Sequence, residues 1–218
     1  MDEVKSFKKR VAAVLRLLDR DYGGADCALN HKNSFELLAA TILSAQCTDK
    51  RVNMVTPQLF KVFSSPFELA RATQGEVEEI IRSTGFYRNK AKNLIGMAQK
   101  LVALHNGEVP QTMEELIALP GVARKTANVV LGVFFGIACG VVVDTHVTRI
   151  SRLLDFTRET SPIKIEQDLI EILPQKKWIG FSHQIILHGR AVCIARRPQC
   201  QECLLNKHCP GAKRIQSS

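Results

Sequence analysis

Long apolar runs are absent from this 218-residue chain. No apolar stretch reaches the roughly 18 residues that a membrane-spanning helix needs, so no membrane span is expected. The first twenty residues, MDEVKSFKKRVAAVLRLLDR, carry charges inside their apolar pattern and no small-residue cleavage site, so no secretory signal peptide is expected. Low-complexity segments and internal repeats are also lacking. With 45% apolar and 23% charged residues, the composition excludes a disordered or collagen-like chain and indicates a globular protein of one large or two small domains.

Acidic residues are the minority among the charges. The chain has 30 Lys and Arg against 21 Asp and Glu, a formal net charge of +9, and this balance favours a nucleic-acid partner without requiring one. Motifs of other enzyme classes are missing, because the chain has no Walker loop, no G-x-S-x-G elbow and no H-E-x-x-H motif. Four of the seven cysteines lie close together near the C-terminus, which favours a metal site over disulfides.

Apolar residues recur at helical spacing through nearly the whole chain, which predicts an all-α fold of about ten short helices. Three helix starts carry a capping signal: Asn33 with Glu36, Ser65-Pro66 with Glu68, and Thr112 with Glu115. Pro57 is expected to split the segment 49–63 into two shorter helices. The most apolar helices, 34–46 and 124–138, are expected at the centre. The last residues, GAKRIQSS, are expected to form a frayed tail.

Residues 119–131 read LPGVARKTANVVL and predict a helix–hairpin–helix. A short helix over 113–118 ends at Leu119-Pro120, a tight turn through Gly121 follows, and the second helix starts near Ala123. Such a turn aims backbone N–H groups outward at a helix N-terminus, where a phosphate oxygen binds. The contact positions a protein on DNA without reading its sequence. A plain corner between two helices is the alternative that the turn by itself leaves open.

Several stretches then follow one another in the order of a known family. They are LLAATILSAQCTD (37–49), GFYRNKAKNL (85–94), LPGVARKTANVVL (119–131), VDTHVTRISRLL (143–154), HGRAVCIARRPQC (188–200) and the four-cysteine cluster. In these stretches the sequence resembles the endonuclease III family of helix–hairpin–helix DNA glycosylases. The resemblance implies a bifunctional DNA glycosylase and abasic-site lyase in base excision repair. One departure is Ala123, which stands where the family usually has the hairpin's second glycine, so a bound phosphate must approach past a methyl group.

Lys125 matches the family's catalytic lysine, just after the hairpin turn. A neutral amine can attack C1′ of a nucleotide, expel the base and leave a Schiff base, which makes β-elimination of the 3′ phosphate possible. Free lysine is protonated at pH 7. The helix N-terminus, partial burial and the neighbouring Arg124 are expected to favour the neutral amine. Without the resemblance, an ordinary lysine–phosphate pair would be the simpler interpretation.

Asp144 matches the family's catalytic aspartate. It also precedes an expected helix over 145–154, so its simplest role is that of an N-cap. Both roles are compatible, because a carboxylate held at a helix N-terminus stays ionised. It can stabilise positive charge that develops on the sugar, and it can take part in proton transfers with Lys125. His146 is a further candidate for the same site, with a surface histidine or a histidine satisfied in the core as the alternative.

The four clustered cysteines, Cys193, Cys200, Cys203 and Cys209, have the spacing C-x6-C-x2-C-x5-C. Four thiolates suit either a [4Fe-4S] cluster or a structural zinc. Zinc sites usually place cysteines in two close pairs, whereas only one close pair occurs here. The spacing matches the cluster loop of the endonuclease III family, so a [4Fe-4S] cluster is the expected cofactor. The other cysteines, Cys27, Cys47 and Cys139, are expected to be buried or idle thiols.

Base removal requires that the target nucleotide leaves the stack, and inserted side chains commonly fill the gap. The resemblance assigns this role to Gln46, and Phe86 is a second candidate wedge. Taken alone, Gln46 would be a polar helix end and Phe86 a core residue. The remaining DNA contacts expected are Lys90, Gly121, Ala123, Arg124, His146, Arg196, Arg197 and Lys207. The alternative for the three basic residues of the cysteine loop is a solvated loop.

The sequence as a whole therefore predicts two helical domains with a DNA groove between them, across which Lys125 faces Asp144. The expected domains are a six-helix domain over 23–137 and a cluster domain over 1–22 plus 138–218. The expected partner is double-stranded DNA with damaged pyrimidines or abasic sites, bound by a cytoplasmic monomer that associates with the nucleoid. Three alternatives remain: an adenine mismatch glycosylase, a non-catalytic DNA-binding module and an electron-transfer protein.

Overall fold

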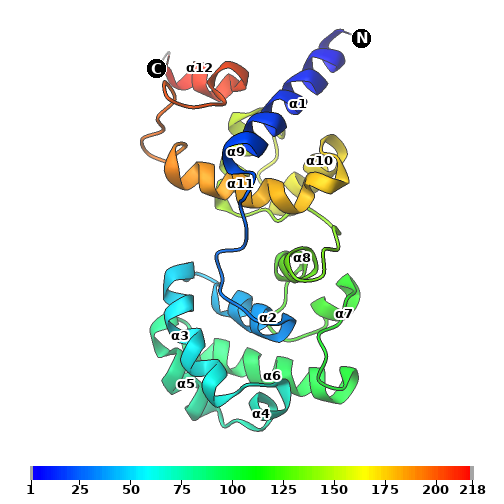
Figure 1. Ribbon diagram of the computed structural model, residues 1–218, viewed down its shortest axis with the longest axis vertical. Coiled ribbons are helices and arrows are strands. Elements are labelled where there is room, and N and C mark those ends of the chain that lie inside the picture. The colour runs from blue at the N-terminus through cyan, green and yellow to red at the C-terminus, as the bar shows by residue number, and fades with distance from the viewer. Residues whose placement is uncertain (1, 217–218) are drawn as a thin grey trace. The chain divides into compact units, whose positions relative to one another are not determined.

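Helices account for the regular structure of the chain (Figure 1). The structure is a computed structural model that describes residues 2–216. In that range it has twelve α-helices, three 3-10 helices and no strand, which confirms the all-α prediction. The α-helices are α1 Asp2–Tyr22, α2 Ser34–Leu43, α3 Asp49–Val62, α4 Pro66–Arg71, α5 Gln74–Ile81, α6 Tyr87–His105, α7 Met113–Ile117, α8 Arg124–Val133, α9 Thr145–Leu153, α10 Pro162–Ile172, α11 Trp178–Ala191 and α12 Pro210–Gln216. The 3-10 helices are η1 Arg82–Thr84, η2 Gln175–Lys177 and η3 Asn206–His208.

The chain folds into two compact units. The continuous unit spans Cys27–Cys139 and holds α2 to α8. The discontinuous unit joins the N-terminal segment up to Asp26 with the chain from Gly140 onward. The sequence predicted domains over 23–137 and over 1–22 plus 138–218. That these limits define functional domains stays a prediction. No helix of residues 2–216 combines the length and the apolar character that crossing a membrane requires.

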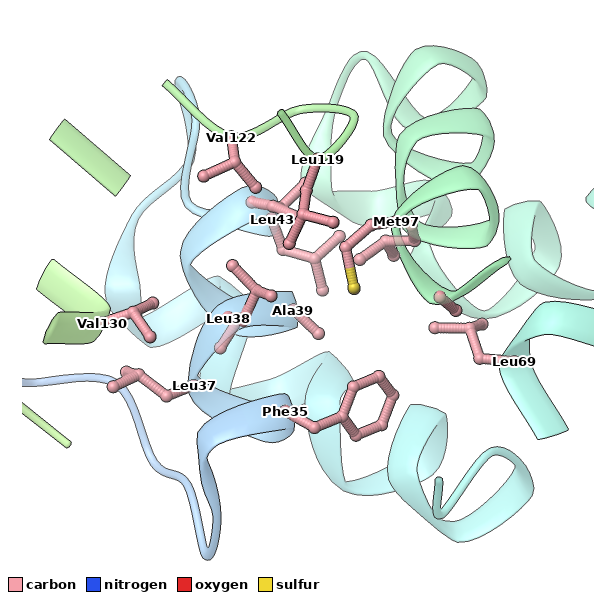
Figure 2. Packing of buried hydrophobic residues seen from close by; sticks show 14 of the residues in the cluster. Phe35, Leu37, Leu38, Ala39, Leu43, Leu69, Met97, Leu119, Val122 and Val130 are labelled. Atoms are coloured by element: carbon pink, nitrogen blue, oxygen red, sulfur yellow. The ribbon is translucent and has the colours of Figure 1, made fainter. Parts of the chain in front are cut away.

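Helix α2 is the centre of the continuous unit (Figure 2). All but the first of its residues are buried, as the expected central position of this segment requires. Leu37, Leu38 and Leu43 are fully buried, and the cluster around them includes Met97 from α6 and Val130 from α8. Burying a side chain of this size stabilises the fold by about 1.5–3 kcal/mol. The hairpin and α6 are therefore packed on one shared core.

The discontinuous unit has a core of its own. Apolar residues of α1, α9, α10 and α11 meet there, among them the fully buried Leu18, Val147, Leu169, Phe181 and Ile185. Helix α1 packs against α11, and α11 packs against α9. Residues separated by more than a hundred positions therefore stabilise one another, which is why the N-terminal helix belongs with the C-terminal part of the chain.

The local capping signals were predictive. The backbone N–H of Glu36 donates to Asn33 Oδ1 over 2.8 Å at the start of α2. Ser65 and Glu68 form a reciprocal capping box at α4, and the Thr112 hydroxyl caps α7. Each of these caps satisfies a helix-terminal N–H group within three residues of sequence. The helix starts that the sequence predicted from caps are thus confirmed.

Two expectations about helices were wrong. Pro57 lies inside α3 without splitting it. The missing N–H removes one hydrogen bond, but Val52 and Val55 before the proline and Leu59 after it are all buried on one face, and this packing keeps the helix continuous. The second error concerns the expected frayed tail, because most of it forms α12.

Helix α12 is held by contacts with α9 and its C-terminal turn. Gly211 is buried so closely that a Cβ atom there would lie 2.7 Å from Leu153 Cδ2. Arg214 donates two hydrogen bonds, of 3.0 and 3.1 Å, to the Asp155 carboxylate. Tertiary contacts, which local composition does not reveal, therefore order the segment 210–216. The last two residues of the expected tail, 217 and 218, lie outside the described residues.

Candidate active site and metal centre

The hairpin between α7 and α8 has the geometry that the sequence predicted. Helix α7 ends at Ile117, and the N–H of Val122 donates to the carbonyl of Leu119 over 3.2 Å to close the turn. Gly121 has φ +76°, a conformation that glycine adopts at no steric cost. Ala123 precedes α8 in an extended conformation, and no side chain caps this helix. The start of α8 therefore keeps the character of an anion site made by helix N–H groups.

Helix α6 supports the hairpin from beneath, which the sequence did not reveal. A Cβ atom at Gly121 would lie 2.9 Å from Asn93 Cβ, and one at Gly96 would lie 3.2 Å from Pro120 Cγ. The Lys100 ammonium donates to the carbonyl of Ala118 over 2.7 Å. The turn is thus fixed in place by contacts that a substitution of Gly121 would disrupt.

Lys125 is the second residue of α8 and is exposed, as is Arg124 before it. Ala127 and Val130, on the opposite face of the helix, are fully buried in the core of the continuous unit. Core packing therefore sets the rotation of α8 and turns Lys125 toward solvent beside the hairpin. The partial burial expected for Lys125 is not found in this structure, so its amine is directly open to a ligand.

Asp144 is the N-cap of α9, as predicted. Its Oδ1 accepts a hydrogen bond of 2.8 Å from the N–H of Val147, and the side chain is half-buried. The cap holds the carboxylate in one orientation at a helix N-terminus, where a negative charge is stabilised. Asp144 belongs to the discontinuous unit and Lys125 to the continuous unit. Their expected meeting across a groove stays a prediction.

His146 faces the interior of its own unit. Its Nδ1 lies 3.3 Å from the Arg149 guanidinium, and it packs so closely on α11 that a Cβ at Gly189 would lie 2.5 Å from it. Burial lowers the pKa of His146, although the Asp144 charge opposes the shift. These contacts favour the interpretation as a core histidine over the expected contact with DNA.

Gln46 and Phe86 share an unusual backbone. Gln46 has φ 52° and Phe86 has φ 47°, both in the left-handed region that residues other than glycine rarely occupy. Both side chains are exposed, and Phe86 leaves 67% of its surface in solvent just before α6. A strained backbone costs about 1–3 kcal/mol and commonly marks a functional site. The exposure of Phe86 speaks against its interpretation as a core residue. Asn106 and Asp155 also have positive φ, so the wedge role of Gln46 and Phe86 stays a prediction.

Lys90 does not reach the surface. Only 4% of it is exposed, and its ammonium donates to the carbonyl of Thr84 over 2.8 Å. Burial lowers the pKa of the Lys90 amine. This placement speaks against the phosphate contact that the sequence suggested. Lys90 is instead a buried amine behind the turn that carries Phe86.

The four clustered cysteines line one cavity of the discontinuous unit. Cys193 follows the end of α11, Cys209 precedes α12, and Cys200 and Cys203 lie in the loop between them. Apolar side chains complete the wall: Ile150, Leu153, Leu154, Val192 and Leu205. Burial raises the pKa of Cys203 to about 11, and the charges of the other three thiolates add to this rise. The raised pKa disfavours the thiolate form of Cys203 in the absence of a bound metal, and a bound metal would favour that form.

A layer of polar residues behind these cysteines escaped the sequence analysis. Arg149 donates to the carbonyl of Cys193 over 2.6 Å and lies 3.4 Å from its sulfur. His188 is fully buried, with Nε2 3.5 Å from the Cys203 sulfur and Nδ1 3.2 Å from the Tyr22 hydroxyl. Lone arginine and histidine residues carry no local signal, and only the fold brings them to the cavity.

The four cysteines are a donor set that suits either a [4Fe-4S] cluster or a structural zinc. In residues 2–216 no three His, Cys, Asp or Glu side chains converge closely enough to hold one ion. A tetrahedral zinc with Zn–S bonds of 2.3 Å would bring its sulfurs to about 3.8 Å from one another. An iron–sulfur cluster binds each thiolate to a separate iron and needs a wider arrangement. The four cysteines line one cavity, which is compatible with such an arrangement.

The basic residues of the cysteine loop are all on the surface. Arg196, Arg197 and Lys207 are exposed, and Arg196 and Arg197 lie between Cys193 and Cys200, where the chain forms turns rather than a helix. The loop that wraps the cavity therefore presents three positive charges to solvent. The structure places them in the discontinuous unit, whereas the hairpin belongs to the continuous unit.

Comparisons with known proteins identify the family of this chain. Residues 39–175 match the model of the HhH-GPD superfamily base excision DNA repair proteins. Endonuclease III of Synechocystis sp. is 54% identical over 97% of this chain and 96% of its own, and that of Bacillus subtilis is 43% identical over 87% of each. The solved structure of a trapped endonuclease III–DNA covalent intermediate is similar, with a TM-score of 0.90 and 42% identity over 96% of this chain and 98% of that one.

A second solved structure, of a non-covalent endonuclease III–DNA complex, has a TM-score of 0.91 and 42% identity over 97% of this chain and 99% of that one. A thermostable thymine-DNA glycosylase, with a TM-score of 0.82 and 18% identity, shares the fold. The chain therefore belongs to the endonuclease III family within the HhH-GPD superfamily of base excision DNA repair proteins. It is a DNA N-glycosylase and abasic-site lyase.

Proposed function

We propose that Lys125 is the nucleophile with which this enzyme attacks damaged pyrimidine nucleotides and abasic sites in double-stranded DNA. The observation that carries the proposal is the exposed amine at the second position of α8, beside a hairpin whose helix has no side-chain cap. Phosphate bound at the hairpin would bring the sugar of the same strand close to this amine. The trapped covalent intermediate of an endonuclease III relative supports the same kind of chemistry.

The reaction has two stages, base release and strand cleavage, and one lysine can serve both. The neutral Lys125 Nζ forms a bond to C1′ while the C1′–N bond breaks, and the base leaves with the electron pair and takes up a proton. The amine then loses its proton and the ring oxygen leaves C1′, which gives a Schiff base. Loss of the C2′ proton moves electrons toward the imine and expels the 3′ phosphate. Water finally releases the lysine.

Asp144 supports these steps electrostatically. Its carboxylate is fixed by the Val147 N–H, so it costs no reorganisation when positive charge develops on the sugar. The same oxygens are suitable to accept and return protons during Schiff-base formation. We therefore propose that Asp144 faces Lys125 across the DNA groove when substrate is bound.

Cys193, Cys200, Cys203 and Cys209 are proposed to hold a [4Fe-4S] cluster. When bound, the cluster supplies a rigid cross-link of the loop, and its four thiolates leave no iron position open to substrate. The chain's own residues keep the sulfurs in place: Arg149 at Cys193 and His188 at Cys203. The exposed Arg196, Arg197 and Lys207 are then held in position to contact DNA phosphates.

The remaining assignments complete this account. The hairpin, with Gly121, Ala123 and Arg124, is proposed to bind the backbone of the damaged strand, and Gln46 and Phe86 to fill the gap left by the extruded nucleotide. The two units are proposed to be the two domains that flank the DNA. We further propose that the enzyme works as a monomer on DNA in the cytoplasm.

A panel of duplexes with one lesion each tests the substrate class. We expect base release and strand cleavage at oxidised pyrimidines, and strand cleavage at abasic sites, with an undamaged duplex as control. Release of adenine opposite an oxidised purine, without cleavage at oxidised pyrimidines, would contradict the proposal and favour the adenine mismatch alternative. Binding of all duplexes without any cleavage would instead indicate a non-catalytic DNA-binding protein.

A further inference from the structure

Lys90 is a buried amine that the proposed reaction does not use. It lies in the first turn of α6, four residues after Phe86, and is 4% exposed. Its ammonium donates a hydrogen bond of 2.8 Å to the carbonyl of Thr84. Within residues 2–216 no carboxylate pairs with it. Burying a cation with one carbonyl partner is unfavourable, so stability alone does not explain a lysine at this position.

The hydrogen bond of Lys90 reaches back over the turn that carries Phe86. Thr84, the acceptor, is itself buried, and its hydroxyl donates to the carbonyl of Ile81 over 2.8 Å. Gly85 follows with φ 70°, and Phe86 with φ 47°. Two consecutive left-handed residues cannot hold this shape by backbone preference, because Phe86 is not glycine. The bond from Lys90 to Thr84 closes the base of the turn and fixes its direction.

The two helices that flank the loop with Gln46 pack close to Lys90, because α2 contacts α6 and α3 contacts η1. Cys47 directly follows Gln46, and a charge on its thiol would raise the pKa of the Lys90 amine. Cys47 is packed against the core of the continuous unit, to which all these residues belong. Lys90 therefore lies between the loop with Gln46 and the turn with Phe86, behind both exposed side chains.

We propose that Lys90 is a positioning residue that holds the Phe86 turn in register with the Gln46 loop, so that both wedges enter the duplex together. The proposal rests on the proposed role of Gln46 and Phe86 in base extrusion. It assigns Lys90 no contact with DNA. Replacing Lys90 should therefore slow base extrusion and leave the number of phosphate contacts unchanged.

The test compares Lys90→Met with Lys92→Met. Methionine keeps most of the length and apolar character of the buried stem but removes the donor to Thr84. Lys92 is an exposed lysine of the same helix and provides a control with the same loss of charge. Extrusion is followed by stopped-flow fluorescence of 2-aminopurine beside the lesion, and DNA affinity is measured against salt concentration.

We expect extrusion by Lys90→Met to be slower by about tenfold to a hundredfold, the usual cost of a misplaced group. Its slope of log affinity against log salt should equal that of the wild type. If Lys90 were a phosphate contact, that slope would fall by about 0.9 and extrusion of bound DNA would be unchanged. Such a result would overturn the proposal. Normal extrusion and excision by the wild type and by Lys92→Met show that the proposed function itself holds.

A second variant keeps the test decisive if Lys90→Met does not fold. Lys90→Gln retains an N–H donor toward Thr84 but has no positive charge. Positioning requires the donor and not the charge, so this variant should extrude the base at close to the wild-type rate, and its Phe86 turn should keep its protection from hydrogen exchange. A Lys90→Gln protein with normal exchange at residues 84–87 but a reduced salt slope would contradict the proposal.

Discussion

Individual residues of this enzyme combine a structural and a chemical task. Asp144 caps α9 through the Val147 N–H, and the same bond orients the carboxylate that the proposed reaction needs. Lys125 is turned outward because Ala127 and Val130 on the opposite face of α8 are buried. A helix cap orients the Asp144 carboxylate, and the buried face of α8 orients Lys125. In both cases the residues that set the orientation lie within five positions of the side chain that they orient: Val147 for Asp144, and Ala127 and Val130 for Lys125.

Replacing Asp144 by Asn separates its two tasks. Asparagine caps helices about as well as aspartate, so the melting temperature should stay close to that of the wild type. Loss of the charge should slow single-turnover base excision by about 10²- to 10⁴-fold, the usual contribution of a general acid or base. The reverse exchange at another cap, Asn33→Asp, serves as control and should leave both quantities unchanged. Unchanged excision by Asp144→Asn would mean that the residue is only a cap.

The sequence allowed some site residues to be predicted and not others. Gln46 and Phe86 were found through the family resemblance, and their left-handed backbones give a physical reason that sequence patterns do not contain. Lys90 was expected to contact a phosphate because it closely follows Phe86, whereas the fold buries it behind the Phe86 turn. Arg149 and His188 were missed, because their partners Cys193 and Cys203 lie 44 and 15 residues away in the chain and lone residues of these types carry no local signal.

At the scale of elements, local signals predicted where helices begin better than where they continue. The caps at Asn33, Ser65 and Thr112 act within three residues and mark α2, α4 and α7 correctly. Pro57 failed as a breaker, because burial on both sides of it stabilises α3 by more than the lost hydrogen bond costs. The prediction of a frayed tail was wrong because α9, far away in sequence, packs against α12 and supports it. Long-range packing overrides local preference in both cases.

The hairpin provides a prediction at this scale. Gly121→Ala forces a side chain into a left-handed turn and places a Cβ atom 2.9 Å from Asn93 Cβ. We expect a loss of stability of about 1–3 kcal/mol, as for other strained backbone positions, and weaker binding to undamaged duplex. Gly75→Ala, in α5, is the control, because a Cβ atom there has nothing within 4 Å and alanine stabilises helices by about 0.5–1 kcal/mol.

Denaturant unfolding and fluorescence anisotropy with labelled duplex measure the two effects. The stability and the DNA affinity of the two variants are compared with each other, because both variants add one methyl group to a glycine. Equal stability of the two proteins, with equal affinity for DNA, would show that the hairpin turn does not depend on the conformation of Gly121.

At the scale of the whole molecule, the chain separates its tasks between two units. The continuous unit contains Lys125, the hairpin and the two proposed wedges, whereas the discontinuous unit contains Asp144 and the cysteine cavity. The proposed reaction therefore requires both units, while the proposed cluster organises only one. The all-α class followed from periodicity, but the pairing of α1 with α11 depends on packing between distant segments, which periodicity does not reveal.

Metal content tests the role assigned to the discontinuous unit. Purified without oxygen, the protein should contain about four irons per chain, as a cluster with four cysteine ligands implies. Cys203→Ala should lower iron content, melting temperature and DNA affinity, whereas Cys139→Ala, in the other unit, should change none of them. The fraction of Cys203→Ala that stays folded should still form the Schiff base. Zinc in place of iron and sulfide would contradict the cluster assignment.

Borohydride trapping on a duplex with one oxidised pyrimidine tests the central claim most directly, because reduction converts the Schiff base into a stable bond between protein and DNA. Lys125→Ala should give no trapped complex while it binds the duplex with nearly wild-type affinity. Lys61→Ala, which removes an exposed lysine from α3 of the same unit, should trap like the wild type. Trapping by Lys125→Ala at the wild-type level would assign the nucleophile to another residue and contradict the account.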